Sequence, residues 1–152
     1  MPFRVLFVCS GNICRSPTAE AVLRRIVDDA GMSGDIEVDG AGTGDWHVGQ
    51  PPDPRATEAA GRRGIVLTGR ARQVTRSDFD EFDLILAVDD ENLLRLGEIA
   101  PPTARAHLRR LDDSDVPDPY YGGPDGFDVV LDQVDAACRR LLEEIRADLR
   151  QD

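Results

Sequence analysis

The 152-residue sequence contains no lysine, so all 18 of its basic residues are arginines. This absence excludes a phosphate loop with a Walker lysine, a Schiff-base enzyme and a pyridoxal phosphate site. Any cationic side chain that contacts a substrate must therefore be an arginine. The 29 acidic residues give a formal charge of −11, which argues against general affinity for nucleic acid or an anionic membrane. An anionic small substrate is still compatible with this charge, because a local field can oppose the global one.

Cysteine is scarce, and long apolar runs are missing. Cys9, Cys14 and Cys138 are an odd set without the spacing of zinc ligands or of a secreted disulfide scaffold, which favours a reducing, cytoplasmic setting. The apolar start of the chain is too short for a membrane span or a signal sequence, so the chain is expected to be soluble and unprocessed. The length predicts one domain, residues 1–152, that needs no disulfide or structural metal.

Short apolar runs alternate with segments of helical periodicity. Strands are predicted at residues 4–8, 36–38 and 84–88, and a weaker edge strand at 106–111. Helices are predicted after the first strand, near 56–63, around 92–96 and, most clearly, over 127–149. This alternation predicts an α/β fold with a parallel, doubly wound, twisted sheet. The glycine-rich run 40–44 lacks the spacing of a dinucleotide loop and is predicted to be a tight turn beside the active site.

The segment after the first strand carries the strongest functional signal. Ligands of such sheets bind beyond the carboxyl ends of the strands. Pro17 stands at a favourable first helical position, so the segment must end at a helix N-terminus. The free N–H groups and the dipole of that helix predict a cradle for an anion, and the Arg15 guanidinium can bind two of the anion's oxygens. The predicted phosphate-binding residues are Ser10, Gly11, Asn12, Ile13, Cys14, Arg15 and Ser16.

Cys9 is the predicted nucleophile within this cradle. Thiols at helix N-termini or beside arginine are readily deprotonated, because these positive groups stabilise the thiolate. Ser16 is placed either to donate a hydrogen bond to the sulfur or simply to cap the helix, and the Asn12 amide can hold the loop in its conformation. For Cys14 two interpretations stay open, packing and a redox partner of Cys9. Cys138 lies on the apolar stripe of the last helix and is predicted to be a core residue.

A phosphoryl group attacked by Cys9 leaves an alkoxide or phenoxide that needs a proton. Asp118 is the predicted general acid, because its proline-flanked loop follows the last strand and so lies at the same rim of the sheet. Trp46, Tyr120 and Tyr121 are loop aromatics that can enclose an aromatic substrate. Other polar residues of these loops are predicted to be caps and turn anchors, without chemistry: Asp53, Arg55, Asp89 and Asn92. His47 and His107 are assigned no role.

These residues resemble the low-molecular-weight protein tyrosine phosphatases over nearly the whole chain. The resemblance rests on residues 8–17, 41–49 and 52–55 and on the run Asp118-Pro119-Tyr120-Tyr121-Gly122. It implies a four-stranded parallel sheet with helices on both faces and the phosphate-binding loop between the first strand and the first helix. It also implies hydrolysis of phosphotyrosine in protein substrates, and of small aryl phosphates, through a phosphocysteine. No metal or organic cofactor is implied, and inorganic phosphate and related oxyanions are expected inhibitors.

The resemblance also assigns roles to single residues. Cys9 resembles the nucleophile, Arg15 the phosphate clamp, Ser16 the donor to the thiolate and Asn12 the amide that orders the loop. Asp118 resembles the acid that protonates the phenolate and then activates the hydrolytic water.

The predicted substrate slot and the second cysteine follow from the same resemblance. Trp46, Tyr120 and Tyr121 resemble the walls of the phosphotyrosine slot. Cys14 is similar to a cysteine that forms a reversible disulfide with the nucleophile after oxidation, which would protect Cys9 from irreversible oxidation.

One departure from the family is visible. Many members carry a histidine near the position of Gly69, where it helps to hold the loop asparagine, and this chain has none there. Thr43, which is similar to a supporting hydroxyl of the family, is therefore expected to contribute more to holding Asn12.

Three functions other than that of a phosphotyrosine phosphatase also use an anion cradle of this kind. An arsenate reductase of the same fold needs two further cysteines in a mobile segment, and residues 84–96 contain none. A phosphoprotein-binding module without catalysis conflicts with the presence of Cys9 and Asp118. A phosphatase for another small phosphate ester is the third alternative, and the flanking aromatics favour an aryl ester.

Overall fold

Strands and helices alternate along the chain in the computed structural model, which describes residues 1–120, 122–123 and 125–151. Their order is β1 (Phe3–Cys9), α1 (Arg15–Asp29), β2 (Ile36–Gly42), α2 (Pro54–Gly61), α3 (Asp78–Glu81), β3 (Leu84–Ala87), α4 (Asp90–Ile99), β4 (His107–Arg110) and α5 (Asp125–Gln151). None of the helices in these ranges combines the length and the apolar character needed to cross a membrane.

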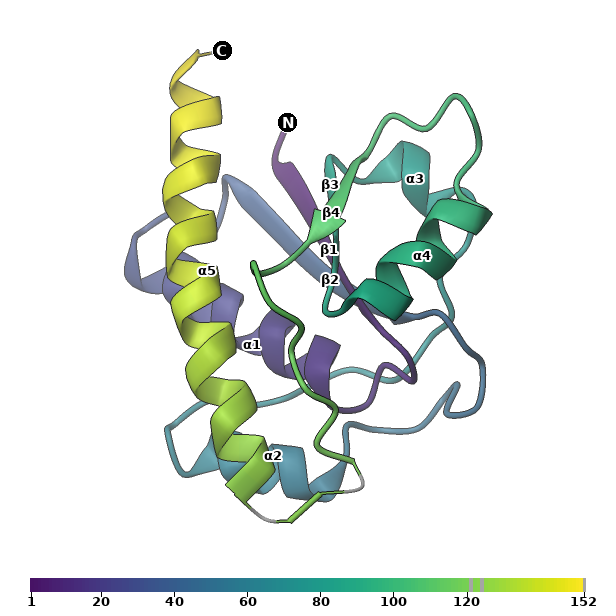
Figure 1. Cartoon of the computed structure of the whole chain (residues 1–152). Helices are drawn as coiled ribbons and strands as arrows, with labels where there is room; N and C mark the ends of the chain where they lie inside the picture. Colours follow the sequence, from purple (N-terminus) through teal and green to yellow (C-terminus); the bar gives the residue numbers. More distant parts are fainter. Residues whose placement is uncertain (121, 124, 152) are drawn as a thin grey trace.

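The four strands form one parallel sheet in the order β2-β1-β3-β4 (Figure 1). This confirms the predicted α/β architecture and the edge position of the last strand. After β2 the chain crosses to the other side of β1 to form β3, so the strand order reverses beside β1. That reversal is the switch point where open α/β sheets bind ligands, and Cys9 is the last residue of β1.

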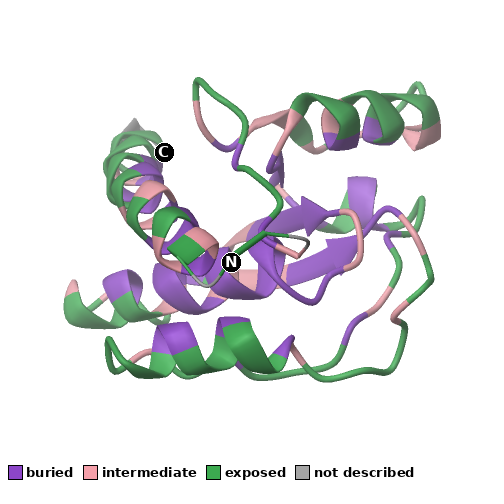
Figure 2. Ribbon diagram, turned by 60° about the horizontal axis from the view of Figure 1, so that its bottom comes forward, coloured by how far each residue is buried: buried purple, intermediate pink, exposed green. Residues whose placement is uncertain are grey.

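Two apolar cores hold the central strand from both faces. Successive side chains of a strand point in opposite directions. Accordingly, Val5, Phe7 and Cys9 pack in the core shared with α1, α2 and α5, whereas Leu6 and Val8 pack in the core shared with α3 and α4. Figure 1 shows these two groups of helices on opposite sides of the sheet, and Figure 2 shows the buried residues concentrated in the strands and on the inner helix faces. The packing therefore fixes the position of Cys9.

Capping residues set the starts of two helices. The Asp53 carboxylate accepts a hydrogen bond from the Arg55 N–H at the start of α2, and the Asp89 carboxylate accepts one from the Asn92 N–H at the start of α4. Pro54 occupies the first position of α2, where its missing N–H is not needed. The predicted capping roles of Asp53 and Asp89 are confirmed.

Several boundaries differ from the predictions. α1 begins at Arg15, so Pro17 is its third residue rather than its first. Proline is tolerated there because the N–H groups of the first turn have no acceptor within the helix. α4 covers residues 90–99 rather than 92–96, and the one-turn helix α3 was not predicted because four residues are too few for a periodic pattern.

The glycine-rich run 40–44 is mainly strand, so the predicted tight turn is wrong. Gly40, Ala41 and Gly42 are the last residues of β2 and pair with residues 7–9 of β1. A Cβ atom at Gly42 would lie 2.8 Å from the backbone oxygen of Ser10. Glycine is needed at this position because β2 approaches the loop after β1 too closely for a side chain.

Candidate active site

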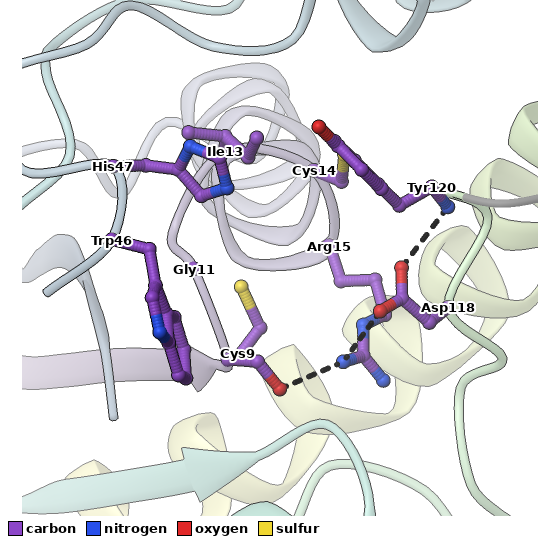
Figure 3. Close-up of a pocket in the computed structure, with 10 residues that line it drawn as sticks. Cys9, Gly11, Ile13, Cys14, Arg15, Trp46, His47, Asp118 and Tyr120 are labelled. Atoms are coloured by element: carbon purple, nitrogen blue, oxygen red, sulfur yellow. Dashed lines mark hydrogen bonds and ion pairs between the residues drawn. The ribbon is translucent and has the colours of Figure 1, made fainter. Parts of the chain in front are cut away.

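A cavity of about 430 Å³ lies at the carboxyl end of β1 (Figure 3). This volume is within the range of small-molecule sites in proteins. Every residue that lines it, except His47, is one of the predicted site residues: Cys9, Ser10, Gly11, Ile13, Cys14, Arg15, Trp46, His47, Asp118 and Tyr120. The fold thus brings together segments that are up to about a hundred residues apart in the sequence.

Three backbone carbonyl groups between the end of β1 and the start of α1 are directed away from this cavity. Their oxygens accept hydrogen bonds from backbone N–H groups of other segments: Cys9 from Thr43, Ser10 from Gly44 and Ile13 from Asp53. The C=O and the following N–H of a trans peptide point in opposite directions, so the N–H groups after these carbonyls face the cavity. Together with the start of α1, they form a ring of donors for an anion.

Asn12 gives the loop its turn. Its φ of 58° lies in the left-handed region, which asparagine adopts more readily than most other residues with a side chain. The buried side chain is held at both ends: Nδ2 donates to Ser16 Oγ at 2.7 Å, and Oδ1 accepts from the Arg72 N–H at 3.1 Å. Thr43 was expected to contribute to holding Asn12. In the described part of the chain Arg72 and Ser16 hold it, while Thr43 supports the loop through its N–H to Cys9.

The Cys9 sulfur receives hydrogen bonds from two sides. The Asn12 N–H donates to it at 3.2 Å, and Ser16 Oγ lies 3.0 Å away. Because Asn12 Nδ2 already donates to Ser16 Oγ, the Ser16 hydroxyl proton is free to point at the sulfur. Ser16 is the second residue of α1, so the alternative that it merely caps the helix does not hold. Both donors favour a negatively charged sulfur.

The Arg15 guanidinium is fixed beside the sulfur. Its Nη1 donates to Asp89 Oδ2 at 2.6 Å and to the Val116 carbonyl at 2.9 Å, and its Nη2 lies 3.7 Å from Asp118 Oδ2. Burial alone would lower the pKa of Arg15, but its interactions with Cys9 and Asp89 raise that pKa above the ordinary value. Arg15 therefore carries a full positive charge next to Cys9 and Asp118.

Two residues of the site were missed by the sequence analysis. Asp89 was expected only to cap a helix, yet it also binds Arg15. Its position after β3, the strand beside β1, was a usable signal, because the carboxyl ends of neighbouring parallel strands share one rim. His47 lines the cavity, and its ring would lie 2.7 Å from a Cβ at Gly11, which explains the glycine there. His47 follows the predicted slot residue Trp46 within the run 41–49, and this position was a usable signal.

Two aromatic side chains flank the cavity. Figure 3 shows Trp46 and Tyr120 on opposite sides of it, with Asp118 beside Arg15. Trp46 is 69% exposed, so one face of its ring is available to a ligand. The Arg55 guanidinium lies 5.3 Å from the centre of the Tyr120 ring and supports it by a cation–π contact. The predicted slot residue Tyr121 lies outside the described residues.

All three cysteines are free, and they differ in environment. Burial, with contributions from Asp53 and Cys9, raises the pKa of Cys14 to about 12. Cys138 is completely buried in the core on α5, as predicted, and burial raises its pKa as well. Cys14 and Cys138 are therefore protonated thiols at neutral pH, and neither matches the environment of Cys9.

A nucleophilic sulfur, an anion cradle with an arginine and a carboxyl group opposite define the class of cysteine-dependent phosphatases. The family described as low molecular weight phosphotyrosine protein phosphatase matches residues 4–151. A low molecular weight protein-tyrosine-phosphatase of Streptomyces coelicolor is 46% identical over 96% of this chain and 95% of its own length.

Solved structures agree with this match. YfkJ from Bacillus subtilis has a TM-score of 0.90 at 43% identity and covers 97% of each chain. A protein tyrosine phosphatase from Entamoeba histolytica has a TM-score of 0.93 at 35% identity, with 96% of this chain and 98% of that chain covered. The chain belongs to the low molecular weight phosphotyrosine protein phosphatase family and is a hydrolase.

Proposed function

We propose that this enzyme hydrolyses phosphotyrosine in proteins, and small aryl phosphates, through a phosphocysteine on Cys9. The observation that carries the proposal is the Cys9 sulfur, which accepts hydrogen bonds from Asn12 and Ser16 inside a cavity that also contains Arg15. A thiolate that accepts these hydrogen bonds is the nucleophilic form of the cysteine, and the surrounding N–H groups bind the oxygens of the group that it attacks.

In the first step the Cys9 thiolate attacks phosphorus. The S–P bond forms while the bond between phosphorus and the aryl oxygen breaks, and Arg15 with the loop N–H groups neutralises the charge on the phosphoryl oxygens. Asp118 gives its proton to the departing phenolate. The Tyr120 N–H donates to Asp118 Oδ1 at 3.0 Å, which holds the carboxyl group in place.

In the second step a water molecule attacks the phosphorus of the phosphocysteine. The S–P bond breaks, the Asp118 carboxylate takes a proton from the water, and phosphate and the Cys9 thiolate are released. The Asp118 side chain is 46% exposed, so water reaches it from the solvent. Because phosphate is the product released from the phosphate-binding loop, we expect inorganic phosphate and vanadate to be competitive inhibitors.

The surroundings of the cavity support an aryl ester as substrate. Cys9 is only 3% exposed, so a phosphate group must enter the cavity to reach the sulfur. A phosphotyrosine side chain is long enough for this, and its ring can lie between Trp46 and Tyr120. A phosphoserine side chain is much shorter, and we expect peptides that carry it to be poor substrates.

Rapid-quench capture of the phosphoenzyme tests the proposal. The enzyme is mixed with an aryl phosphate and quenched in acid, and the phosphorylated residue is mapped by mass spectrometry. We expect the phosphoryl group on Cys9. Cys9→Ser should lose turnover yet still bind vanadate. Phosphate trapped on another residue, or substantial turnover by Cys9→Ser, would overturn the assignment of the nucleophile.

We also infer a cytoplasmic location and a redox role for Cys14. Both rest on the three unpaired cysteines, of which Cys14 lies in the cavity beside Cys9. Mild peroxide treatment should then produce a Cys9–Cys14 disulfide, whereas a Cys9 sulfinic acid as the sole product would contradict this role. Immunoblotting of fractionated cells tests the location.

A further inference from the structure

Ser10 of the phosphate loop accepts two hydrogen bonds and has one to give. Asn92 Nδ2 donates to Ser10 Oγ at 3.2 Å, and Arg15 Nη2 donates to it at 3.4 Å. Neither an amide nor a guanidinium nitrogen can accept a hydrogen bond. The Ser10 hydroxyl proton is therefore directed at neither partner. Ser10 lines the same cavity as Cys9, so this proton has the bound substrate within reach.

Asn92 donates to Ser10 although its buried position lowers the stability of the fold. Asn92 is 1% exposed. Among the buried side-chain nitrogen and oxygen atoms of the described residues, its Oδ1 is the single one without a hydrogen-bond partner. An unpaired buried acceptor destabilises a fold, so its presence needs a reason. The start of α4 supplies both contacts: its N-cap Asp89 binds Arg15, and Asn92 in its first turn binds Ser10. This helix thus orients both ends of the phosphate loop.

We propose that Ser10 is a further catalytic residue, whose hydroxyl donates a hydrogen bond to an oxygen of the phosphoryl group, and that Asn92 is a positioning residue that keeps this proton pointed into the cavity. The inference rests on the proposed function, because the phosphoryl group is the one attacked by Cys9. A fixed donor of this kind stabilises the transition state as negative charge shifts among the phosphoryl oxygens.

Substitution of Ser10 tests the donor. Ser10→Ala is expected to lower kcat/KM for p-nitrophenyl phosphate by about 10-fold or more and to weaken inhibition by vanadate by a similar factor, since a hydrogen bond to a charged group is lost. Ser10→Thr keeps a hydroxyl and should retain most of the activity. Ser33→Ala, in an exposed position after α1, is the control and should match the wild type. Unchanged kcat/KM and vanadate affinity in Ser10→Ala would overturn the inference.

Asn92→Asp tests the direction of the hydrogen bond. The aspartate keeps the shape of the side chain but replaces the amide donor with an acceptor, which would draw the Ser10 proton out of the cavity. We expect a loss comparable to that of Ser10→Ala, and little further loss when both substitutions are combined. Full activity of Asn92→Asp would mean that Ser10 already donates to residue 92, and independent, multiplying losses would remove the positioning role.

Two measurements keep these outcomes separate from other failures. The phosphoenzyme burst counts active sites, so kcat refers only to folded enzyme. If the wild type failed to hydrolyse aryl phosphates, the proposed function would fail. If the wild type forms the Cys9 phosphoenzyme and Ser10→Ala matches it in every constant, only the role of Ser10 fails.

Discussion

Glu20 of α1 carries a carboxyl group that is largely, but not fully, buried behind the phosphate loop. Its side chain is 12% exposed and pairs with Arg24 at 2.7 Å. One of its oxygens would lie 2.6 Å from a Cβ at Gly40, so the glycine leaves room for this carboxyl group. Burial raises the pKa of Glu20 from 4.5 to about 7, and Asp39 adds to the rise, against the attraction of Arg24 and Arg72.

This shift predicts how Glu20 changes stability with pH. A rise of the pKa from 4.5 to about 7 corresponds to about 3 kcal/mol. Because the pKa is raised in the folded state, the contribution of Glu20 to stability is fully present below the unfolded pKa of 4.5 and is lost as the pH rises through about 7. The neutral Glu20→Gln variant escapes this loss. We expect it to match the wild type near pH 4 and to exceed it by about 3 kcal/mol near pH 8.

Urea unfolding followed by far-UV circular dichroism across this pH range measures the difference between the two proteins. Carboxyl groups that do not interact with Glu20 titrate equally in both proteins, so their effects cancel. Glu58→Gln is the matched control, because Glu58 also pairs with an arginine four residues later, Arg62, but is 75% exposed. Its difference from the wild type should not change with pH. If the Glu20→Gln difference were equally flat, burial would not outweigh the ion pair, and the reasoning would be refuted.

Three further predictions concern the site. Asp118→Asn is expected to slow hydrolysis by about 10²–10⁴-fold, with the larger losses for basic leaving groups, because no proton reaches the phenolate. Steady-state rates for a series of aryl phosphates measure this effect, and equal losses across the series would contradict it. Iodoacetamide near pH 7 should alkylate Cys9 first and leave Cys14 and Cys138 as thiols, because burial raises the pKa of both, that of Cys14 to about 12. Peptide mapping identifies the alkylated cysteine, and early labelling of Cys14 would contradict this prediction. Gly42→Ala should destabilise the protein by about 1–3 kcal/mol and lower kcat, because its Cβ would lie 2.8 Å from a carbonyl oxygen of the phosphate loop. A variant with normal urea unfolding and normal kcat would disprove the close approach of the two backbones.

Local patterns were enough to predict the architecture and the core of the chemistry. Apolar runs that alternate with helical periodicity determine a parallel α/β sheet, because each pattern reflects which face of a strand or helix is buried. Cys9, Arg15 and Ser16 stand within eight consecutive residues, so one strand end and one helix start bring them together without help from the rest of the chain. Their predicted placement in one site agrees with the structure for this reason.

Long-range contacts decided the remainder of the site. Arg72 holds Asn12 through its backbone N–H, a group that every residue except proline has, so no side-chain pattern could reveal it. Asp89 and Asn92 look like ordinary residues of a helix start, and their second contacts, with Arg15 and Ser10, arise only because β3 lies beside β1.

Close packing in the folded chain also explains the glycines at the end of β2 and the shifted pKa values, which the sequence did not predict. The glycine-rich end of β2 looked like a turn, but Gly40 leaves room for the Glu20 carboxyl group of α1, and Gly42 leaves room for the phosphate loop. The raised pKa values of Glu20 and Cys14 come mainly from burial of these groups in the folded chain. Residue types and their spacing thus determined which groups can react, whereas the tertiary structure decided how each group is held, how closely the backbone approaches it and how much water surrounds it, because these depend on segments that meet only in the folded chain.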